Sequence, residues 1–218
     1  MRILIRPKPK STDAIHVDSA AIRITSRPLR VLDFDIENRP LTYLGSDFTT
    51  AEVTSIAWAW TDTPERVTVH LLGESDLPQI LQAFVQAYNA ADLVTGHYIK
   101  GHDLPMLNGA LMEFRLPVLA DKLVQDTKTD LVRSKGISLS QESLGAMFRL
   151  EHAKVQMNQA KWRAANRLTP EGLDAVRDRV VGDVRQHIDL RNELLALGYL
   201  AAPRLWKSGT ARTESYVP

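Results

Sequence analysis

An α/β fold with a mixed sheet is predicted by three features of the sequence. Three strand-like segments come first along the chain, and alternating helical and strand patterns follow them. The later helical segments are long enough to provide the crossovers that parallel strand pairing requires. The chain has 218 residues, of which 44% are apolar and 24% charged, and this size and composition fit one packed globular domain.

Four strands are located by their residue patterns. The first is expected over residues 29–37, where apolar and acidic residues alternate. Residues 53–60 and 66–72 predict two further strands, and the short turn around residues 61–64 indicates that these two pair antiparallel. A fourth short strand is expected over residues 93–96.

The helical segments are marked by capping residues and by apolar residues at helical spacing. One helix is expected to start at Asp76, which is followed by a proline near the first turn. A second is expected to begin near residues 103–105, and a third over residues 138–147, capped near Ser140 or Gln141. The apolar seam of the second helix is expected to comprise Met106, Leu107, Leu111 and Met112.

Basic residues gather at both ends of the chain. The net charge is +1 overall, but +5 over residues 1–30 and +2 over residues 200–218, which leaves −6 between them. We interpret residues 1–28 as a basic arm, 29–200 as the folded domain and 201–218 as a tail. An acidic centre suits a carboxylate metal site, and basic ends suit a polyanion, although terminal Lys and Arg are as often simply solvated.

Several classes of protein are disfavoured by composition. The sequence has no cysteine, which excludes disulfides, zinc–thiolate sites and thiol nucleophiles. The apolar runs at residues 53–60 and 194–202 are shorter than a membrane span, and the N-terminus lacks the features of a signal peptide. We therefore expect a cytoplasmic protein without a membrane partner. In the tail, Leu205 and Trp206 are candidates to pack back on the domain, and the residues after Ser208 are expected to be disordered.

Three carboxylates are expected to project from one face of the first strand. Asp33, Asp35 and Glu37 are two residues apart, so they share a face in an extended chain. They repel one another, and a hard divalent cation is the natural compensation. Asp33 is expected to be exposed one pleat below the site, with a supporting role as the alternative. Such a pair at a strand end is, by itself, more often only a polar edge.

A second acidic motif lies in residues 94–107, and a third in a late helix expected to start at Thr169. The second motif reads Gly96-His97-Tyr98 followed by His102-Asp103-Leu104-Pro105, and the third contains Asp183. With Phe34-Asp35-Ile36-Glu37, these motifs resemble those of the DEDD superfamily of 3′–5′ exonucleases, the DnaQ-like group that includes polymerase proofreading domains. Its second motif is typically G-H-N-x-x-x-F-D-x-P, so Tyr98 replaces an asparagine and His102 a phenylalanine.

The resemblance spans residues 30 to about 200 and implies a ribonuclease H-like α/β fold, with a mixed five-stranded sheet flanked by helices. Asp103 has a simpler interpretation as an N-cap before Leu-Pro, and Asp183 as a surface residue of an amphipathic helix. However, Asp183 shares a stripe beside the apolar seam with four residues that turn it toward the sheet. These are Val176, Val180, His187 and Leu190. All four carboxylates together favour the metal site.

The resemblance also implies a role for each carboxylate. Asp35, Glu37 and Asp183 would bind one Mg²⁺ or Mn²⁺, Asp35 would bridge to a second ion, and Asp103 would support that second ion through water. Two ions about 3.5–4 Å apart activate the attacking water and stabilise the leaving 3′-oxygen. Ligation by carboxylates without sulfur favours Mg²⁺ or Mn²⁺ over zinc.

The residues at the positions of the family's general base differ from the family pattern. Family members carry Tyr four residues, or His five residues, before the third aspartate, whereas this chain has Arg179 and Asp178 there. Arginine stays protonated and cannot take a proton from water, but it could contact the scissile phosphate. His187, one turn after Asp183, is a candidate base, although a lone helical histidine is more often a polar surface residue.

Nucleic-acid contacts are expected in the loop before Asp103. His97, Tyr98 and His102 are candidates to stack on terminal bases, and Lys100 is a candidate to meet a phosphate. Residues 161–167 combine an aromatic residue with three basic ones and form another candidate contact. Trp162, however, is more simply interpreted as a core anchor of an irregular connection.

The function predicted from these observations is metal-dependent 3′–5′ exonuclease activity on single-stranded DNA ends. The chain resembles stand-alone exonucleases of actinobacterial bacteriophages, which implies a role in phage DNA replication, repair or recombination in the host cytoplasm. Any proofreading role would require a replication or repair protein as partner. The alternatives are a non-enzymatic nucleic-acid-binding module on a decayed nuclease fold, a 3′–5′ exoribonuclease, and a metal-dependent phosphatase or nucleotidase.

Overall fold

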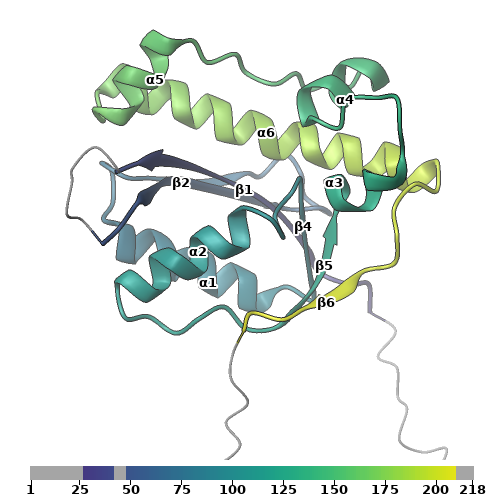
Figure 1. Ribbon diagram of the computed structural model, residues 1–218, viewed down its shortest axis with the longest axis horizontal. Helices are drawn as coiled ribbons and strands as arrows, with labels where there is room; N and C mark the ends of the chain where they lie inside the picture. Colours follow the sequence, from purple (N-terminus) through teal and green to yellow (C-terminus); the bar gives the residue numbers. More distant parts are fainter. Residues whose placement is uncertain (1–26, 42–47, 210–218) are drawn as a thin grey trace, which may run out of the picture.

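A six-stranded mixed sheet forms the centre of the computed structural model, which describes residues 27–41 and 48–209 (Figure 1). The strands are β1 (Val31–Pro40), β2 (Ala51–Trp60), β3 (Thr68–Leu71), β4 (Leu93–Gly96), β5 (Lys122–Asp126) and β6 (Arg204–Trp206). Their order in the sheet is β3-β2-β1-β4-β5-β6. Strand β1 pairs antiparallel with β2 and parallel with β4, which places it at the junction of the two kinds of pairing.

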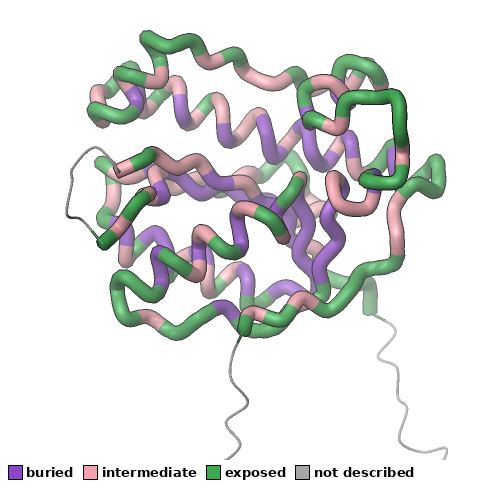
Figure 2. Tube along the Cα trace, viewed as in Figure 1, coloured by how far each residue is buried: buried purple, intermediate pink, exposed green. Residues whose placement is uncertain are grey.

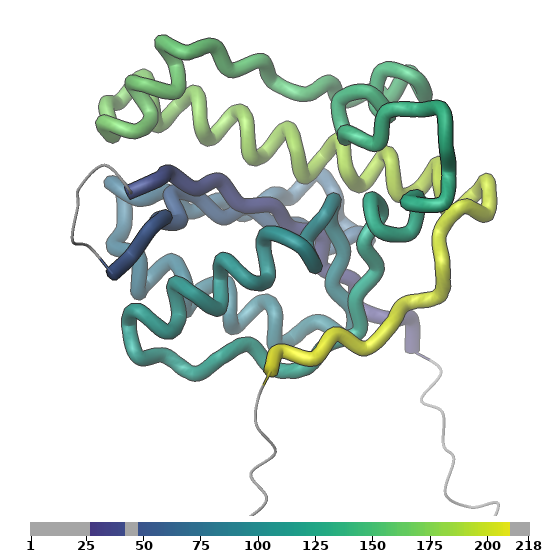
Figure 3. The backbone as a smooth tube through the Cα atoms, viewed as in Figure 1, coloured from purple at the N-terminus to yellow at the C-terminus, as the bar shows by residue number. Residues whose placement is uncertain are grey.

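Helices cover both faces of this sheet, as the backbone in Figure 3 shows. Helices α1 (Leu77–Ala90) and α2 (Asp103–Glu113) pack on one face. The long helix α6 (Pro170–Ala196) crosses the other face, and α4 (Gln141–Phe148) and α5 (Gln159–Asn166) pack against it. The short α3 (Thr127–Asp130) and the 3-10 helix η2 (Leu131–Arg133) follow β5.

Strand β1 divides its side chains between these two layers because successive residues of a strand point to opposite faces. Leu32, Phe34 and Ile36 are buried in the large core cluster shared with α1 and α2. The intervening Asp33, Asp35 and Glu37 therefore face α6. Figure 2 shows that the buried residues concentrate in the sheet and on the helix faces turned toward it.

Helix α6 is fixed at its start and along one stripe. The hydroxyl of Thr169 accepts a hydrogen bond from the backbone N–H of Gly172, and Pro170 occupies the first turn, as the sequence predicts. A buried stripe of Val180, Val184 and Ile188 packs on the alanines of β2. This packing determines which other residues of α6 face the acidic side of β1.

The main elements agree with the sequence predictions. The antiparallel pairing of β2 with β3 is confirmed, and so are the side-chain caps Asp76 of α1 and Ser140 of α4. In the predicted seam of α2, Leu107 and Leu111 are buried, but Met112 is 75% exposed.

Three parts of the prediction are corrected. The sheet has six strands rather than five, because the tail contributes β6 as an edge strand antiparallel to β5. Trp206 packs on the core as expected, whereas Leu205 is exposed. The predicted irregular connection before α6 contains helix α5. The basic arm falls almost entirely outside the described residues, as do the residues from 210 onward.

No helix within residues 27–41 and 48–209 has both the length and the apolar character needed to cross a membrane. Helix α6 is the longest, with 27 residues, but charged side chains recur along it.

Candidate metal centre

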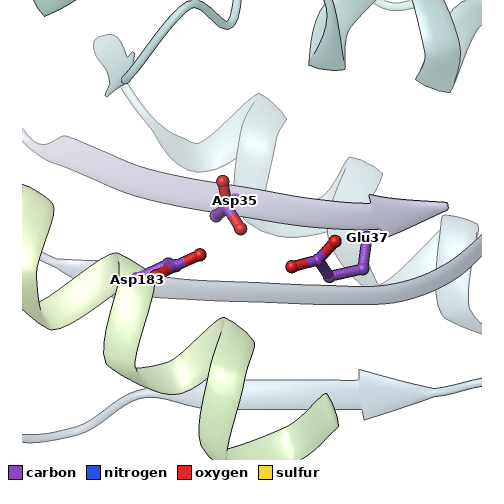
Figure 4. A group of neighbouring side chains, drawn as sticks. All are labelled: Asp35, Glu37 and Asp183. Atoms are coloured by element: carbon purple, nitrogen blue, oxygen red, sulfur yellow. The ribbon is translucent and has the colours of Figure 1, made fainter. Parts of the chain in front are cut away.

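Three carboxylates from two elements meet between the sheet and α6. Asp35 and Glu37 project from β1, and Asp183 projects from α6 toward them (Figure 4). One oxygen from each of the three lies within 4.8 Å of the others. Oxygen atoms at this separation can ligate one divalent cation, so the sequence-predicted residues of β1 and α6 are brought together as one group.

The fourth predicted carboxylate, Asp103, is the first residue of α2 and is buried. Its Oδ1 accepts a hydrogen bond of 3.2 Å from the backbone N–H of Ile36, the residue between Asp35 and Glu37. The N-cap of α2 is His102, whose side chain makes no capping bond. The interpretation of Asp103 as a simple N-cap is therefore wrong, because its carboxylate turns to β1.

A cavity of about 290 Å³ opens over these groups. All four predicted carboxylates line it, and so do four of the five predicted nucleic-acid contacts. Its lining comprises Asp35, Ile36, Glu37, His97, Tyr98, His102, Asp103, Lys128, Ser140, Gln141, Lys154, Arg179 and Asp183. The fifth, Lys100, is not part of this lining; its backbone N–H donates to Asp126 instead.

The acidic cluster is electrostatically unfavourable without a cation. Burial raises the pKa of Asp35 well above its usual value, and the neighbouring carboxylates Asp103, Asp183 and Glu37 raise it further. Burial also raises the pKa of each of these three neighbours. The raised pKa values reflect the cost of ionising four carboxylates in one cavity, a cost that a bound cation would lower.

Two cationic side chains offset part of this charge. The Nε of Arg179 lies 2.9 Å from Oδ2 of Asp183 and 3.3 Å from Oε1 of Glu37. The Nζ of Lys154 lies 3.4 Å from the same Oδ2 of Asp183. A further hydrogen bond of 2.7 Å, donated to the carbonyl of Val155, holds the Arg179 guanidinium in place.

The donor set fits a hard divalent ion. The other oxygen of Asp183, Oδ1, is buried and has no hydrogen-bond partner in the part of the chain that the structure describes. A buried carboxylate oxygen without a partner is costly, and a cation would satisfy it. The group offers only carboxylate oxygens, which suit Mg²⁺ or Mn²⁺ better than softer metals.

Asp33 and His187 form a layer beneath the cluster. Asp33 is fully buried, and its Oδ2 lies 2.6 Å from Nδ1 of His187, which is 2% exposed. The expectation of an exposed Asp33 is therefore wrong. His187 lies behind the carboxylates rather than in the cavity lining, and its Nε2 is 3.0 Å from the hydroxyl of Thr127.

A chain of hydrogen bonds continues from this layer to the cavity wall. Nε2 of His97 is 2.8 Å from the carbonyl of Leu139, so it must carry a proton to donate. Burial lowers the pKa of His97 to about 4, so the ring is neutral near pH 7 and Nδ1 accepts from Thr127 at 2.9 Å. Having donated its proton there, Thr127 can accept from His187. The polar atoms of His97 thus hold the wall together.

Tyr98 stands on the rim of the cavity in a left-handed conformation, with φ of 73°, and is 42% exposed. The carboxylate of Asp126 accepts hydrogen bonds from the backbone N–H groups of Tyr98 and Lys100, which fixes this loop. The Nζ of Lys128 lies 4.2 Å from the centre of the Tyr98 ring. Gly101 lies directly under the ring, because a Cβ atom there would be 2.5 Å from Tyr98 Cζ.

Four polar residues of the lining were not predicted as site residues from the sequence: Lys128, Ser140, Gln141 and Lys154. Gln141 donates a 2.8 Å hydrogen bond to the backbone carbonyl of Asp183 and thereby ties α4 to α6. Lys154 lies in an irregular segment without periodicity, and only the path of that segment along α6 brings it to the site. A lysine in such a segment gives no sequence signal of its own.

Comparison with known proteins yields a likeness in fold. No family model and no curated protein matches the sequence. Among solved structures, the chain is similar to the family B DNA polymerase from the hyperthermophilic archaeon Pyrobaculum calidifontis, with a TM-score of 0.62 and 19% sequence identity. The match covers 79% of this chain and 25% of that chain, so this chain spans about a quarter of the polymerase. The two share a fold, and the mixed sheet between helices agrees with the ribonuclease H-like architecture that the sequence predicts.

Proposed function

We propose that the protein is a metal-dependent 3′–5′ exonuclease that hydrolyses phosphodiester bonds at single-stranded DNA 3′ ends. The observation that carries this proposal is the cluster of Asp35, Glu37 and Asp183 within 4.8 Å, in a cavity that also contains Asp103. The fold shared with a DNA polymerase supports the choice of DNA as substrate.

In this proposal the four carboxylates hold two Mg²⁺ or Mn²⁺ ions. When bound, such ions lower the pKa of an attacking water and stabilise the charge that develops on the leaving oxygen. Asp35, Glu37 and Asp183 hold the first ion, and Asp103 contributes to the second. The 3.2 Å hydrogen bond from Ile36 to Asp103 supports this assignment, because it keeps that carboxylate beside β1.

Arg179 and Lys154 are the cationic groups that contact the carboxylates of the proposed site. Before the metal binds, they reduce the repulsion between Asp183 and Glu37. With metal present, the same side chains are available to meet a substrate phosphate from the side of α6, because guanidinium and ammonium groups both donate to phosphate oxygens. The proposal gives His187 no role as general base, since Asp33 and Thr127 engage both of its ring nitrogens.

The terminal base is proposed to stack on Tyr98, with His102 beside it. The Tyr98 ring lies over Gly101 and is 42% exposed, so part of it is accessible to a base. His97 is partly buried and both of its ring nitrogens have partners, so the proposal makes it a support for the wall rather than a ligand for DNA. Lys100 stays a candidate phosphate contact outside the cavity lining.

The test is a degradation assay on 5′-labelled and 3′-labelled single strands. With Mg²⁺ or Mn²⁺, the 5′ label is expected in a ladder of shortened strands and the 3′ label in released mononucleotide. Both products should vanish in EDTA and in Asp35→Ala. Asp189→Asn is the matched control, because Asp189 lies on α6 but pairs with His152 outside the cavity.

Other outcomes select the other functions. Binding without cleavage under every metal condition would indicate a non-enzymatic nucleic-acid-binding module. Preferential loss of RNA strands would indicate an exoribonuclease, and cleavage of nucleotides but not of strands would indicate a nucleotidase or phosphatase. A role in phage DNA replication or repair, with a protein partner, is part of the proposal, and co-purification with a polymerase on primed DNA would test it.

A further inference from the structure

Helix α5 presents one cationic and aromatic face to solvent. A cavity of about 390 Å³ on this face is lined by Gln159, Trp162, Arg163, Asn166 and Arg167. These residues recur at three- and four-residue steps, which places them along one side of the helix. The lining contains no acidic residue.

The charges on this face are not neutralised locally. Arg163 and Arg167 are exposed and take part in no ion pair among residues 27–41 and 48–209. Lys161 is also exposed, and its ammonium group donates a long hydrogen bond of 3.5 Å to the carbonyl of Gln156. Trp162 lines the cavity and also packs against the core cluster of Leu71, Ala165 and Val176, so its indole has a fixed position.

Helix α5 is seated firmly on the rest of the domain. A Cβ atom at Gly172 would collide with the backbone of Ala164, so glycine permits α5 to approach α6 closely. The guanidinium of Arg39, near the end of β1, donates a 2.5 Å hydrogen bond to the carbonyl of Asn166. Helix α5 therefore lies at the end of β1, the strand that carries Asp35 and Glu37 (Figure 1).

The metal cavity and this face are joined by one short segment. Lys154 lines the metal cavity, and Asn158, four residues later, caps α5 with its side chain. Between them, the carbonyl of Val155 accepts from Arg179 of the metal cavity. Positive side chains thus occur at both ends of a segment that is tied to α6.

We propose that this face of α5 binds the single strand behind the 3′-terminal nucleotides, with phosphates on Arg163 and Arg167 and a base against Trp162. Single-strand sites commonly combine a positively charged groove with aromatic rings. The inference rests on the proposed function for its direction, since it takes the metal cavity as the position of the 3′ end.

The test measures how binding of oligothymidylates of increasing length depends on salt. Fluorescence polarisation in EDTA, which prevents cleavage, is compared for the wild type and for Arg163→Ala/Arg167→Ala. Each phosphate contact on a single strand contributes about 0.7 to the slope of log affinity against log salt, so the double variant should lose about 1.4. The loss should be absent for a dinucleotide and appear only with longer strands.

The matched control is Arg133→Ala/Lys135→Ala, which removes two exposed cations from the region of η2. An unchanged slope in the α5 variant, or an equal loss in the control, would overturn the proposed surface. Cleavage of a dinucleotide in Mg²⁺ reports on the metal site separately. Without cleavage, a length-dependent loss in the α5 variant still supports the surface, and only the proposed function fails.

Discussion

The Nδ1 atom of His187 on α6 lies 2.6 Å from Oδ2 of Asp33 on β1, and both side chains are buried. Two residues farther along β1 and one turn earlier on α6, Asp35 and Asp183 face each other in the metal cluster. Two more residues along β1 and one more turn back along α6, Glu37 pairs with Arg179. Strand β1 and helix α6 thus bring three pairs of residues together along their contact. The buried pair, Asp33 and His187, fixes the position of α6 along β1 and so aligns the other two pairs.

The buried pair is expected to contribute strongly to stability. In His187→Ala, Asp33 is left in the interior without its partner, while its other oxygen already lacks a hydrogen bond within the described chain. Removing one member of a buried pair costs about 3 kcal/mol or more, and urea unfolding in EDTA would measure this loss.

His152→Ala is the control for that prediction. His152 and Asp189 lie 2.7 Å apart, but both side chains are partly exposed, so the loss should be below about 1 kcal/mol. Equal losses in the two variants would show that the burial of Asp33 does not determine the effect.

Metal binding is expected to stabilise the folded chain. An ion that binds only the folded state adds about 2.7 kcal/mol at a hundred times its dissociation constant, so Mn²⁺ should raise the melting temperature. In Asp183→Asn the increase should largely disappear, because the amide replaces a ligand of the three-carboxylate cluster.

Asp189→Asn, on the same helix α6, should keep the full increase, since Asp189 lies outside the metal cavity. Differential scanning calorimetry with Mn²⁺ and with EDTA would measure both variants. A wild-type melting temperature that does not respond to Mn²⁺ would contradict the metal site without any reference to catalysis.

The sequence predicts the residues whose positions depend on local geometry. Alternation in β1 places Asp35 and Glu37 on one face, and the caps Asp76 and Thr169 mark where helices start. The apolar stripe of α6 turns Asp183 toward the sheet. These conclusions need only the periodicities of strands and helices.

Residues that depend on chain path are not predictable in this way. The partnership of Asp33 with His187 joins positions 154 residues apart, so an isolated strand pattern makes Asp33 look exposed. Lys154 reaches Asp183 from an irregular segment. Strand β5 has no clear sequence signal, because its five residues have charged ends and show little alternation. Each of these features is decided by tertiary packing.

The stability of the metal-free protein is expected to fall with rising pH because of Asp35. In the unfolded chain this carboxyl ionises near 3.8, whereas burial and the neighbouring carboxylates raise its pKa well above that value in the folded chain. Between the two pKa values the folded state binds more protons, so the free energy of unfolding decreases as pH rises. Asp35→Asn lacks this titrating carboxyl, so its free energy of unfolding does not fall in this way. The difference between the variant and the wild type should therefore increase from about pH 4.5 to about pH 8, the range in which proteins are usually most stable.

Asp92→Asn is the control for the pH dependence. The backbone N–H of Arg30 and the side chain of Arg27 lower the pKa of Asp92. The contribution of ionised Asp92 to the free energy of unfolding is therefore present above pH 3.8, its ordinary pKa, and is lost only as the pH falls below that value. The difference between Asp92→Asn and wild type should therefore stay constant over the same interval. Thermal unfolding in EDTA at several pH values would measure both differences.

Displacement of the Tyr98 ring is expected to weaken binding of a strand end. A Cβ atom at Gly101 would lie 2.5 Å from Cζ of Tyr98, so Gly101→Ala must push the ring off its present position over the loop. Stacking of one base on an aromatic ring is worth about 1–3 kcal/mol, and the affinity for a short single strand in EDTA should fall by about fivefold or more. Gly109→Ala is the matched control: nothing lies within 4 Å of a Cβ there, and alanine in the middle of α2 should raise stability by about 0.5–1 kcal/mol without changing affinity. Equal affinities for the two variants would mean that the strand end does not rest on Tyr98.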